Sequence, residues 1–189
     1  SALFSIVIKR NLDIQVINQI PLVTAAACHK SLSKHISNLY IKWPNDIIAG
    51  TKKIAGILSE SMISDQKVEV LIIGIGINVS DIEFHPSIKD LATSILNETQ
   101  KEISIPLLIE EISTSFRDEY LLFESKTSKF IEYCKTHSNL LNQMITYERD
   151  GKLSSGMVVD INDLGNLLVE TNNKIIELNS GQVHLTSYK

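Results

Sequence analysis

The sequence has little cysteine, little arginine, few aromatic residues and no long apolar segment. Its two cysteines, Cys28 and Cys134, lie far apart and in no CxxC pair, so we expect buried thiols in a reducing compartment. The longest apolar run, VLIIGIGINV, is too short and too rich in glycine to span a bilayer. No charged leader followed by an apolar stretch opens the chain. Together these absences predict a cytoplasmic protein with no membrane partner.

Arginine is sparse and scattered along the chain. Arg10, Arg117 and Arg149 are the only arginines, and the formal net charge is −4, so the sequence does not predict a broad nucleic-acid-binding surface. The five histidines show no metal-ligand spacing, and we expect no metal site built by the protein. The chain has 189 residues, of which 43% are hydrophobic and 21% are charged. This length and composition are typical of one medium globular domain, with or without a small appendage.

Apolar periodicity predicts an α+β first domain, residues 1–140, in which a mixed sheet is flanked by helices. Residues 68–79 are apolar at almost every position, which favours a central strand covered on both faces. The segments 11–15 and 61–67 are expected to be polar connections. Strands are expected at residues 3–8, 40–43, 47–49, 53–60 and 68–79, and helices at 21–39, 91–96, 106–123 and 128–135.

The pattern changes after about residue 141. Short alternating stretches follow, namely MITYE, LSSGMVVDI, NLLVET, KIIEL and QVHLT. They are separated by RDGK, NDLG, TNNK and NSG, whose residues favour turns. Several short strands in so few residues predict a small SH3-like β-barrel over residues 141–189.

One stretch, YIKWPND at residues 40–46, mounts a lysine beside a stiff turn. Pro44 fixes its own φ and favours an extended Trp43. Asn45 and Asp46 then turn the chain through local side-chain hydrogen bonds. Lys42 is thereby held near a strand end, where its compact charge and three donors suit a phosphate or carboxylate oxygen.

Three glycines lie in the interiors of expected strands. Gly56 lies in IAGILSE, while Gly74 and Gly76 alternate in GIGIN and face one side, followed there by Asn78. A single strand glycine more often marks a bulge than a pocket, and GIGIN lacks the helix-opening glycine of a dinucleotide fold. The clustering of all these residues predicts a slot for a flat, uncharged ligand portion, with Lys42 available to an anionic portion.

These motifs carry a family resemblance. KWPNDIIAGTKKIAGILSE followed by IIGIGINVS resembles the biotin protein ligases, in which KWPND, K-[IL]-[AG]-G-[IV]-L-x-E and G-I-G-I-N occur in this order. The later GMVVDINDLGNLLVE and the stretch at residues 181–185 resemble the family's small SH3-like domain. The resemblance covers essentially the whole chain and implies the α+β catalytic domain and C-terminal barrel described above.

The resemblance also implies a role for each motif residue. Lys42 corresponds to the family's catalytic lysine, which contacts the biotin carboxylate and the α-phosphate. Lys53 corresponds to a second lysine near the nucleotide. The implied biotin-binding residues are Lys42, Gly56, Ile57, Gly74 and Gly76, and the implied ATP- or adenylate-binding residues are Trp43, Asn45, Lys53 and Asn78.

The implied activity has two steps. The biotin carboxylate attacks the α-phosphorus of ATP, giving biotinyl-5′-AMP and pyrophosphate, with Mg²⁺ neutralising the phosphates. A lysine of a biotin carboxyl carrier protein then attacks the mixed anhydride, forming an amide and releasing AMP. No enzyme nucleophile is needed, which agrees with a sequence that offers no convincing Ser/His/Asp or Cys/His set. The resemblance also implies a homodimer formed through the central sheet.

Two departures from the family pattern leave alternatives open. The Gly/Arg-rich loop GRGRxGR should precede the first strand, and SALFSIVI resembles the strand that follows it, so we expect that the natural beginning is missing. Thr186 stands where an arginine often follows V-x-L, which puts a nucleotide contact in doubt. The alternatives are a non-catalytic biotin-binding or partner-binding relic without the loop, and a related lipoate or octanoate ligase, against which KWPND and the barrel argue.

Overall fold

The first sheet is antiparallel and has the order β1-β5-β4-β3-β2. The computed structural model describes residues 1–80, 84–149, 151–179 and 183–186. Adjacent strands of this sheet run in opposite directions, so the expected α+β class is confirmed but the sheet is not mixed. Two isolated parallel bridges, Ile41–Ser138 and Lys53–Ala92, lie outside the strand ladders. The strands are β1 Ala2–Asp13, β2 Leu39–Lys42, β3 Asp46–Ala49, β4 Lys52–Ser64 and β5 Lys67–Ile77.

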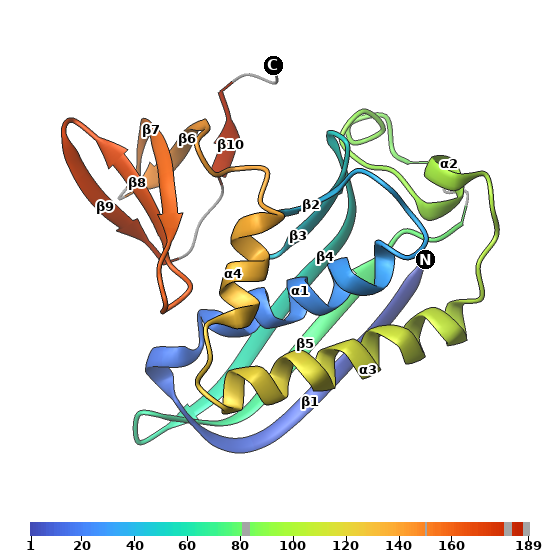
Figure 1. The fold of residues 1–189 in the computed structure, drawn as a ribbon, viewed down its shortest axis with the longest axis horizontal. Helices are drawn as coiled ribbons and strands as arrows, with labels where there is room; N and C mark the ends of the chain where they lie inside the picture. Colours follow the sequence, from blue (N-terminus) through green and yellow to red (C-terminus); the bar gives the residue numbers. More distant parts are fainter. Residues whose placement is uncertain (81–83, 150, 180–182, 187–189) are drawn as a thin grey trace.

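The long helices pack on one face of this sheet. Helix α1 Gln19–Leu32 contacts β2, β3 and β4, and α3 Ile105–Glu124 packs beside α1 and reaches β1. Figure 1 shows both helices on the same side of the strands. The shorter helices are α2 Ile95–Thr99 and α4 Lys129–Thr136. Among the described residues, no helix is both long and apolar enough to cross a membrane.

Strand β5 is covered on one face only, so the expectation of burial on both faces is wrong. Leu71, Ile73 and Ile75 point into the core, whereas Ile72 on the other face is 38% exposed. Gly74 and Gly76 fall on that outer face and are half-buried. The sequence of β5 did not indicate this difference, because its outer-face positions are not polar. Gly74 and Gly76 have no side chain, and Ile72 is apolar although no helix covers it.

Several element boundaries also differ from expectation. Strands β1 and β4 continue to Asp13 and Ser64, because long antiparallel ladders with β5 recruit the polar segments that we expected to be connections. The turn between β4 and β5 is reduced to Asp65 and Gln66, both with positive φ, as tight hairpins require. Helix α1 ends at Leu32, and α2 begins only at Ile95.

Five strands between residues 144 and 185 form a second sheet, called here the C-terminal unit. Its order is β10-β6-β7-β8-β9, with antiparallel pairs, and its core includes Ile145, Val158 and Val169. The five expected strands are all present, and the boundary near residue 141 stays a prediction. Figure 1 shows the unit beside α4 and the β2 end of the first sheet. The strands are β6 Met144–Arg149, β7 Lys152–Ile161, β8 Leu167–Thr171, β9 Lys174–Leu178 and β10 Val183–Leu185.

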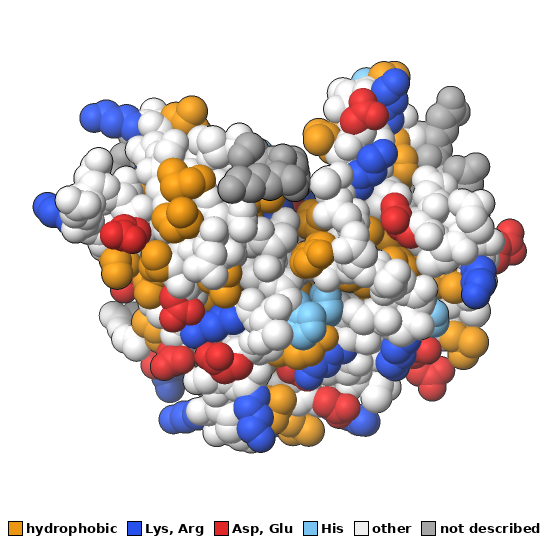
Figure 2. All heavy atoms as spheres, turned by 45° about the horizontal axis from the view of Figure 1, so that its top comes forward, with side chains coloured by type: hydrophobic (Ala, Val, Ile, Leu, Met, Phe, Trp, Pro, Cys, Tyr) orange, Lys and Arg blue, Asp and Glu red, His pale blue; other side chains and the backbone are white. Residues whose placement is uncertain are grey.

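The two cysteines are free and buried, as expected. Burial raises the pKa of the Cys28 thiol to about 12, and it also raises that of Cys134 strongly. The Cys134 thiol donates to the carbonyl of Leu22 in α1. Both thiols therefore serve as packing groups. On the molecular surface, Figure 2 shows basic and acidic side chains interspersed with apolar ones.

Candidate active site

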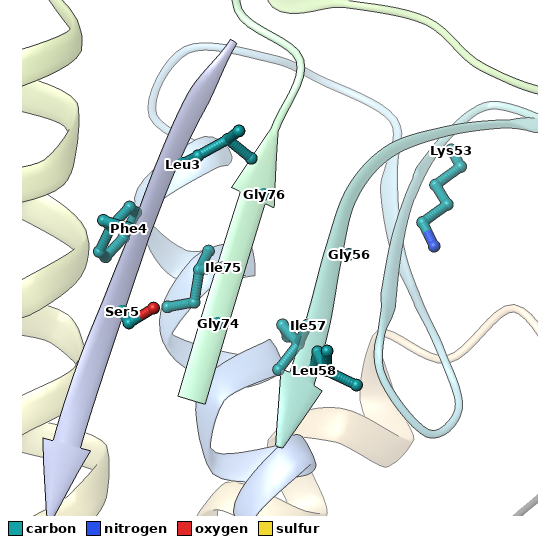
Figure 3. Close-up of a pocket in the computed structure, with 10 residues that line it drawn as sticks. All are labelled: Leu3, Phe4, Ser5, Lys53, Gly56, Ile57, Leu58, Gly74, Ile75 and Gly76. Atoms are coloured by element: carbon teal, nitrogen blue, oxygen red, sulfur yellow. The ribbon is translucent and has the colours of Figure 1, made fainter. Parts of the chain in front are cut away.

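A cavity of about 500 Å³ lies on the outer face of the first sheet, away from the helices. Figure 3 shows how three neighbouring strands build it, β1 on one side, β5 in the middle and β4 on the other. Gly56 and Gly76 stand opposite each other in the β4–β5 ladder, and Gly74 stands opposite Leu58. Five of the nine expected site residues line the cavity. Its lining is Leu3, Phe4, Ser5, Lys53, Gly56, Ile57, Leu58, Gly74, Ile75 and Gly76.

The glycines keep the middle of this cavity free of side chains. A Cβ at Gly76 would lie 3.2 Å from the Cδ2 atom of Leu3, and one at Gly74 would meet only ordinary contacts with Leu58. Leu3 is 79% exposed and can move. Larger side chains at Gly74 and Gly76 would therefore occupy the cavity and leave the core unchanged. The cavity lies at the residues where the sequence predicted a slot, and its use as a ligand-binding slot stays a prediction.

Lys53 closes one end of the slot. Its Cε and Nζ atoms both lie 2.9 Å from the position that a Cβ on Gly56 would take, so the absence of a side chain at Gly56 makes room for the lysine. Its ammonium also forms an ion pair with Asp46, at 2.6 Å from Oδ1. The hairpin register explains this contact, because Asp46 pairs with Gly56 across β3 and β4. From the sequence we expected Asp46 only to form the turn, and its ion pair with Lys53 was not predicted.

Lys42 ends β2, at the base of the turn formed by residues 43–45. It pairs with Asp46 in the β2–β3 ladder and is half-buried. Burial lowers the pKa of its ammonium, Asp46 opposes that shift, and Lys53 adds to it. Lys42 therefore shares an electrostatic neighbourhood with the two charged groups at the end of the slot. It does not itself line the cavity.

The other three expected residues use their polar groups within the protein. The Asn45 side chain donates to the carbonyl of Ile57 at 2.8 Å, and the Asn78 side chain donates to the carbonyl of Thr93 at 3.0 Å. Trp43 is only 2% exposed, and its peptide bond to Pro44 is cis. These contacts shape the surroundings of the slot and do not point into it. Sequence reasoning also missed Leu3 and Leu58, whose only signal was strand alternation.

No protein cage for a metal accompanies the slot. In the described part of the chain, no three histidine, cysteine, aspartate or glutamate side chains come together as a metal site would require. The carboxylate of Asp46 is already paired with Lys53. The described residues therefore do not form a resident metal centre.

Comparison with known proteins agrees with this architecture. Residues 1–78 match the Biotin/lipoate A/B protein ligase family, and residues 140–185 match the Biotin protein ligase C terminal domain. The two matches show that the chain carries domains of the biotin protein ligase family. The first match contains the whole slot and its lysines, and the second covers the C-terminal unit.

The chain is also similar to individual biotin protein ligases. The chain is 30% identical over 192 residues to the bifunctional ligase/repressor BirA of Bacillus subtilis, covering 96% of this chain but only 57% of that protein. The biotin protein ligase of Aquifex aeolicus, solved with biotin and ATP, is 26% identical, with a TM-score of 0.81 over 98% of this chain and 78% of that one. Its apo structure gives 25% identity and a TM-score of 0.83.

Proposed function

We propose that this chain carries the catalytic part of an ATP-dependent ligase that activates biotin as biotinyl-5′-AMP and transfers it to a lysine of a biotin carboxyl carrier protein. The observation that carries the proposal is the slot with glycine-bare walls and a charged end formed by Lys53 and Asp46. The family supports it, since the similar Aquifex aeolicus enzyme was solved with biotin and ATP.

The slot is suited to a flat, uncharged ring system. Gly74 and Gly76 let the ring lie directly against β5, while Leu3 and Leu58 flank it with apolar side chains. We propose that the acyl chain of a ring held there runs toward the end with Lys53, which is linked to Lys42 through Asp46.

The first step requires positioning and charge stabilisation. The biotin carboxylate oxygen attacks the α-phosphorus of ATP, a P–O bond forms, and the bond to pyrophosphate breaks. Ammonium groups at the α-phosphate stabilise the negative charge that accumulates on its oxygens. Lys42 is the group proposed for that role. In the second step the neutral amine of the carrier lysine attacks the acyl carbon, and AMP leaves.

The charge of Lys42 depends on its neighbours. Burial and Lys53 favour loss of its proton, and the carboxylate of Asp46 favours keeping it. Asp46 therefore helps keep Lys42 in the form that can meet an anion. Mg²⁺ would enter with the phosphates of ATP, since the described residues hold no group of side chains that could bind a metal by themselves.

Substitution of Lys42 tests the proposal. In the full-length protein, Lys42→Ala should reduce formation of biotinyl-AMP on the order of 10²–10³-fold while leaving the circular dichroism spectrum unchanged. Lys67→Ala, which removes an exposed lysine at the start of β5, is the matched control. A near wild-type rate of adenylate formation in Lys42→Ala would show that the role assigned to this lysine is wrong.

Calorimetry with biotin, and then with biotinyl-AMP, separates the alternatives. Binding of both with adenylate formation supports the ligase, whereas binding without adenylate formation supports the non-catalytic relic. Preference for lipoate or octanoate over biotin would support the related ligase. The match to the biotin protein ligase C-terminal domain favours biotin. The carrier partner, the homodimer and the cytoplasmic location remain predictions.

A further inference from the structure

We propose that the C-terminal unit positions Lys42, through a hydrogen bond from the indole of Trp43 to the carbonyl of Gly165. The inference rests on the proposed function, because it assigns a task in adenylate formation to a contact outside the slot. Residues 162–166 form the turn that contains Gly165, called here the 162–166 turn. In this proposal the turn positions Lys42.

The turn beside Lys42 is fixed at both of its ends. On one side, the backbone N–H of Ile57 donates to the carbonyl of Asn45 at 2.9 Å, and the Asn45 side chain donates back to the carbonyl of Ile57 at 2.8 Å. On the other side, the buried indole N–H of Trp43 donates to the carbonyl of Gly165 at 2.9 Å. The first anchor belongs to the sheet, and the second comes from 122 residues further along the chain. Lys42 adjoins the second anchor.

The 162–166 turn is itself held by a dense set of local hydrogen bonds. The side-chain oxygen of Asn162 accepts from the N–H groups of Leu164 and Asn166, each at 3.0 Å. The N–H of Gly165 donates to the carbonyl of Asn162 at 2.9 Å. The side-chain amides of Asn162 and Asn166 both donate to Glu177 in β9, at 3.1 and 3.0 Å. The carbonyl that Trp43 uses is therefore presented by a well-defined turn.

The same turn is pressed against the start of α1. Gly165 has a φ of +82°, and a Cβ there would lie 2.9 Å from the carbonyl oxygen of Asn18 and 3.2 Å from a methyl group of Leu22. The Asn18 side chain also donates to the side-chain oxygen of Asn166 at 3.3 Å. Only glycine can adopt this positive φ and also fit against Asn18 and Leu22. The carbonyl of Gly165 is thus fixed relative to α1 and to the indole.

This arrangement predicts which kinetic constant depends on the contact. Neither Trp43 nor any residue of the 162–166 turn lines the slot. Loosening the contact should therefore leave biotin binding largely intact and misplace Lys42 for chemistry. Small displacements of a catalytic group can reduce a rate up to about a hundredfold, so the effect belongs to kcat rather than to KM for biotin.

Gly165→Ala tests the positioning role, with Gly151→Ala as the matched control. Gly151 also has a positive φ, +72°, but no atom lies within 4 Å of its Cβ position, so the control adds a comparable backbone penalty without a clash. In the full-length protein, Gly165→Ala should lower kcat for biotinyl-AMP formation by about tenfold or more and leave KM for biotin within about twofold of wild type. Gly151→Ala should leave both constants near wild type.

Trp43→Phe tests the same contact without changing Gly165. It removes the donor while keeping an aromatic ring, and we expect the same split, a lower kcat with little change in KM. Trp43 is the only tryptophan among residues 1–189, so the emission spectrum of Gly165→Ala should differ from that of wild type, whereas the spectrum of Gly151→Ala should not. This variant keeps the test decisive if Gly165→Ala fails to fold.

Three results would overturn the inference. One is wild-type kcat in both Gly165→Ala and Trp43→Phe, and another is an equal loss in Gly151→Ala. The third is a rise in KM for biotin with kcat unchanged, which would make the contact part of biotin binding. A wild-type protein that forms no biotinyl-AMP overturns the proposed function and the inference together. Wild-type activity with unaffected variants overturns the inference alone.

Discussion

On β5, Leu71, Ile73 and Ile75 are buried beneath the helices, whereas Ile72 is 38% exposed on the opposite face and Gly74 and Gly76 present bare backbone there. The inner face is filled by branched side chains packed against α1 and α3. The outer face keeps an empty strip between β1 and β4. One strand thus contributes to a dense core on one side and to a cavity on the other.

The contrast extends to the neighbouring strands. On the outer face, Leu3 of β1 and Leu58 of β4 are 79% and 62% exposed, and both border the slot. Apolar side chains with so much exposure add little to the stability of the fold, since the hydrophobic contribution follows the area removed from water. The difference teaches that stability and ligand binding are divided between the two faces of the same strands. Substitutions can separate these two contributions.

The largest effect on stability is expected from the inner face. Ile73→Ala removes a fully buried side chain and should lower the free energy of unfolding by about 2–5 kcal/mol. Ile72→Ala, its neighbour on the outer face, should change it by less than about 1 kcal/mol. Urea denaturation of the two variants measures both values. Equal losses would mean that the two faces do not differ as described.

On the outer face the largest effect should appear in ligand binding. Gly76→Val fills the middle of the slot, and we expect biotin affinity to fall by about a hundredfold, or roughly 3 kcal/mol. Stability should change little, because the nearest atom to the new side chain belongs to the exposed Leu3. Calorimetry with biotin, alongside urea denaturation, checks both parts.

Glu69→Val places the same residue on β5 at an exposed position outside the slot and is the control. Its affinity for biotin should equal that of wild type. If Gly76→Val retains full affinity, the ring does not lie against β5 and the slot is not the biotin site. If Gly76→Val instead unfolds, the glycine is required by the fold, contrary to the comparison of the two faces.

Local chemistry explains what the sequence could predict. The turns of the C-terminal unit were predictable because Asn, Asp and Gly favour turns wherever they occur together, and all five strands between them followed. The slot was predictable because glycine is rare in strand interiors, so Gly56, Gly74 and Gly76 stand out against their neighbours. The roles of these residues came from family resemblance, which adds information that no single strand contains.

Long-range relations were not predictable from the sequence. Nothing near Trp43 indicates that its indole meets Gly165, because that contact depends on how the two sheets pack. The one-sided burial of β5 depends likewise on where the helices settle. The Lys53–Asp46 ion pair lies between these cases, since the register of a short hairpin places Asp46 beside Gly56 and could have indicated it.

A smaller effect should follow from removing the charge of Asp46. Because this carboxylate raises the pKa of Lys42, Asp46→Asn should lower that pKa further. Lys42 would then lose its proton at lower pH, and the alkaline limb of the pH–rate profile for biotinyl-AMP formation should move toward neutrality. Glu69→Gln, which removes an exposed carboxylate on β5, should leave the profile in place. An unmoved limb in Asp46→Asn would show that Asp46 does not control the charge of Lys42.

The smallest effect concerns the cost of holding Lys42 partly buried. Its pKa is lowered from the ordinary 10.5 chiefly by burial, so at neutral pH both the folded and unfolded states carry the proton and the folded state bears the penalty. Lys42→Met should therefore raise stability slightly at pH 7, by a limited amount because solvent screens a half-exposed group. The gain should shrink as pH rises from the lowered pKa toward 10.5, since the wild-type ammonium then deprotonates first in the folded state.

Thermal unfolding of Lys42→Met and of Lys67→Met across this range provides the measurement. A gain in stability combined with lost adenylate formation would identify Lys42 as a residue kept for chemistry although it destabilises the fold. A loss of stability at pH 7 would instead show that the packing of its aliphatic chain outweighs the cost of the buried charge.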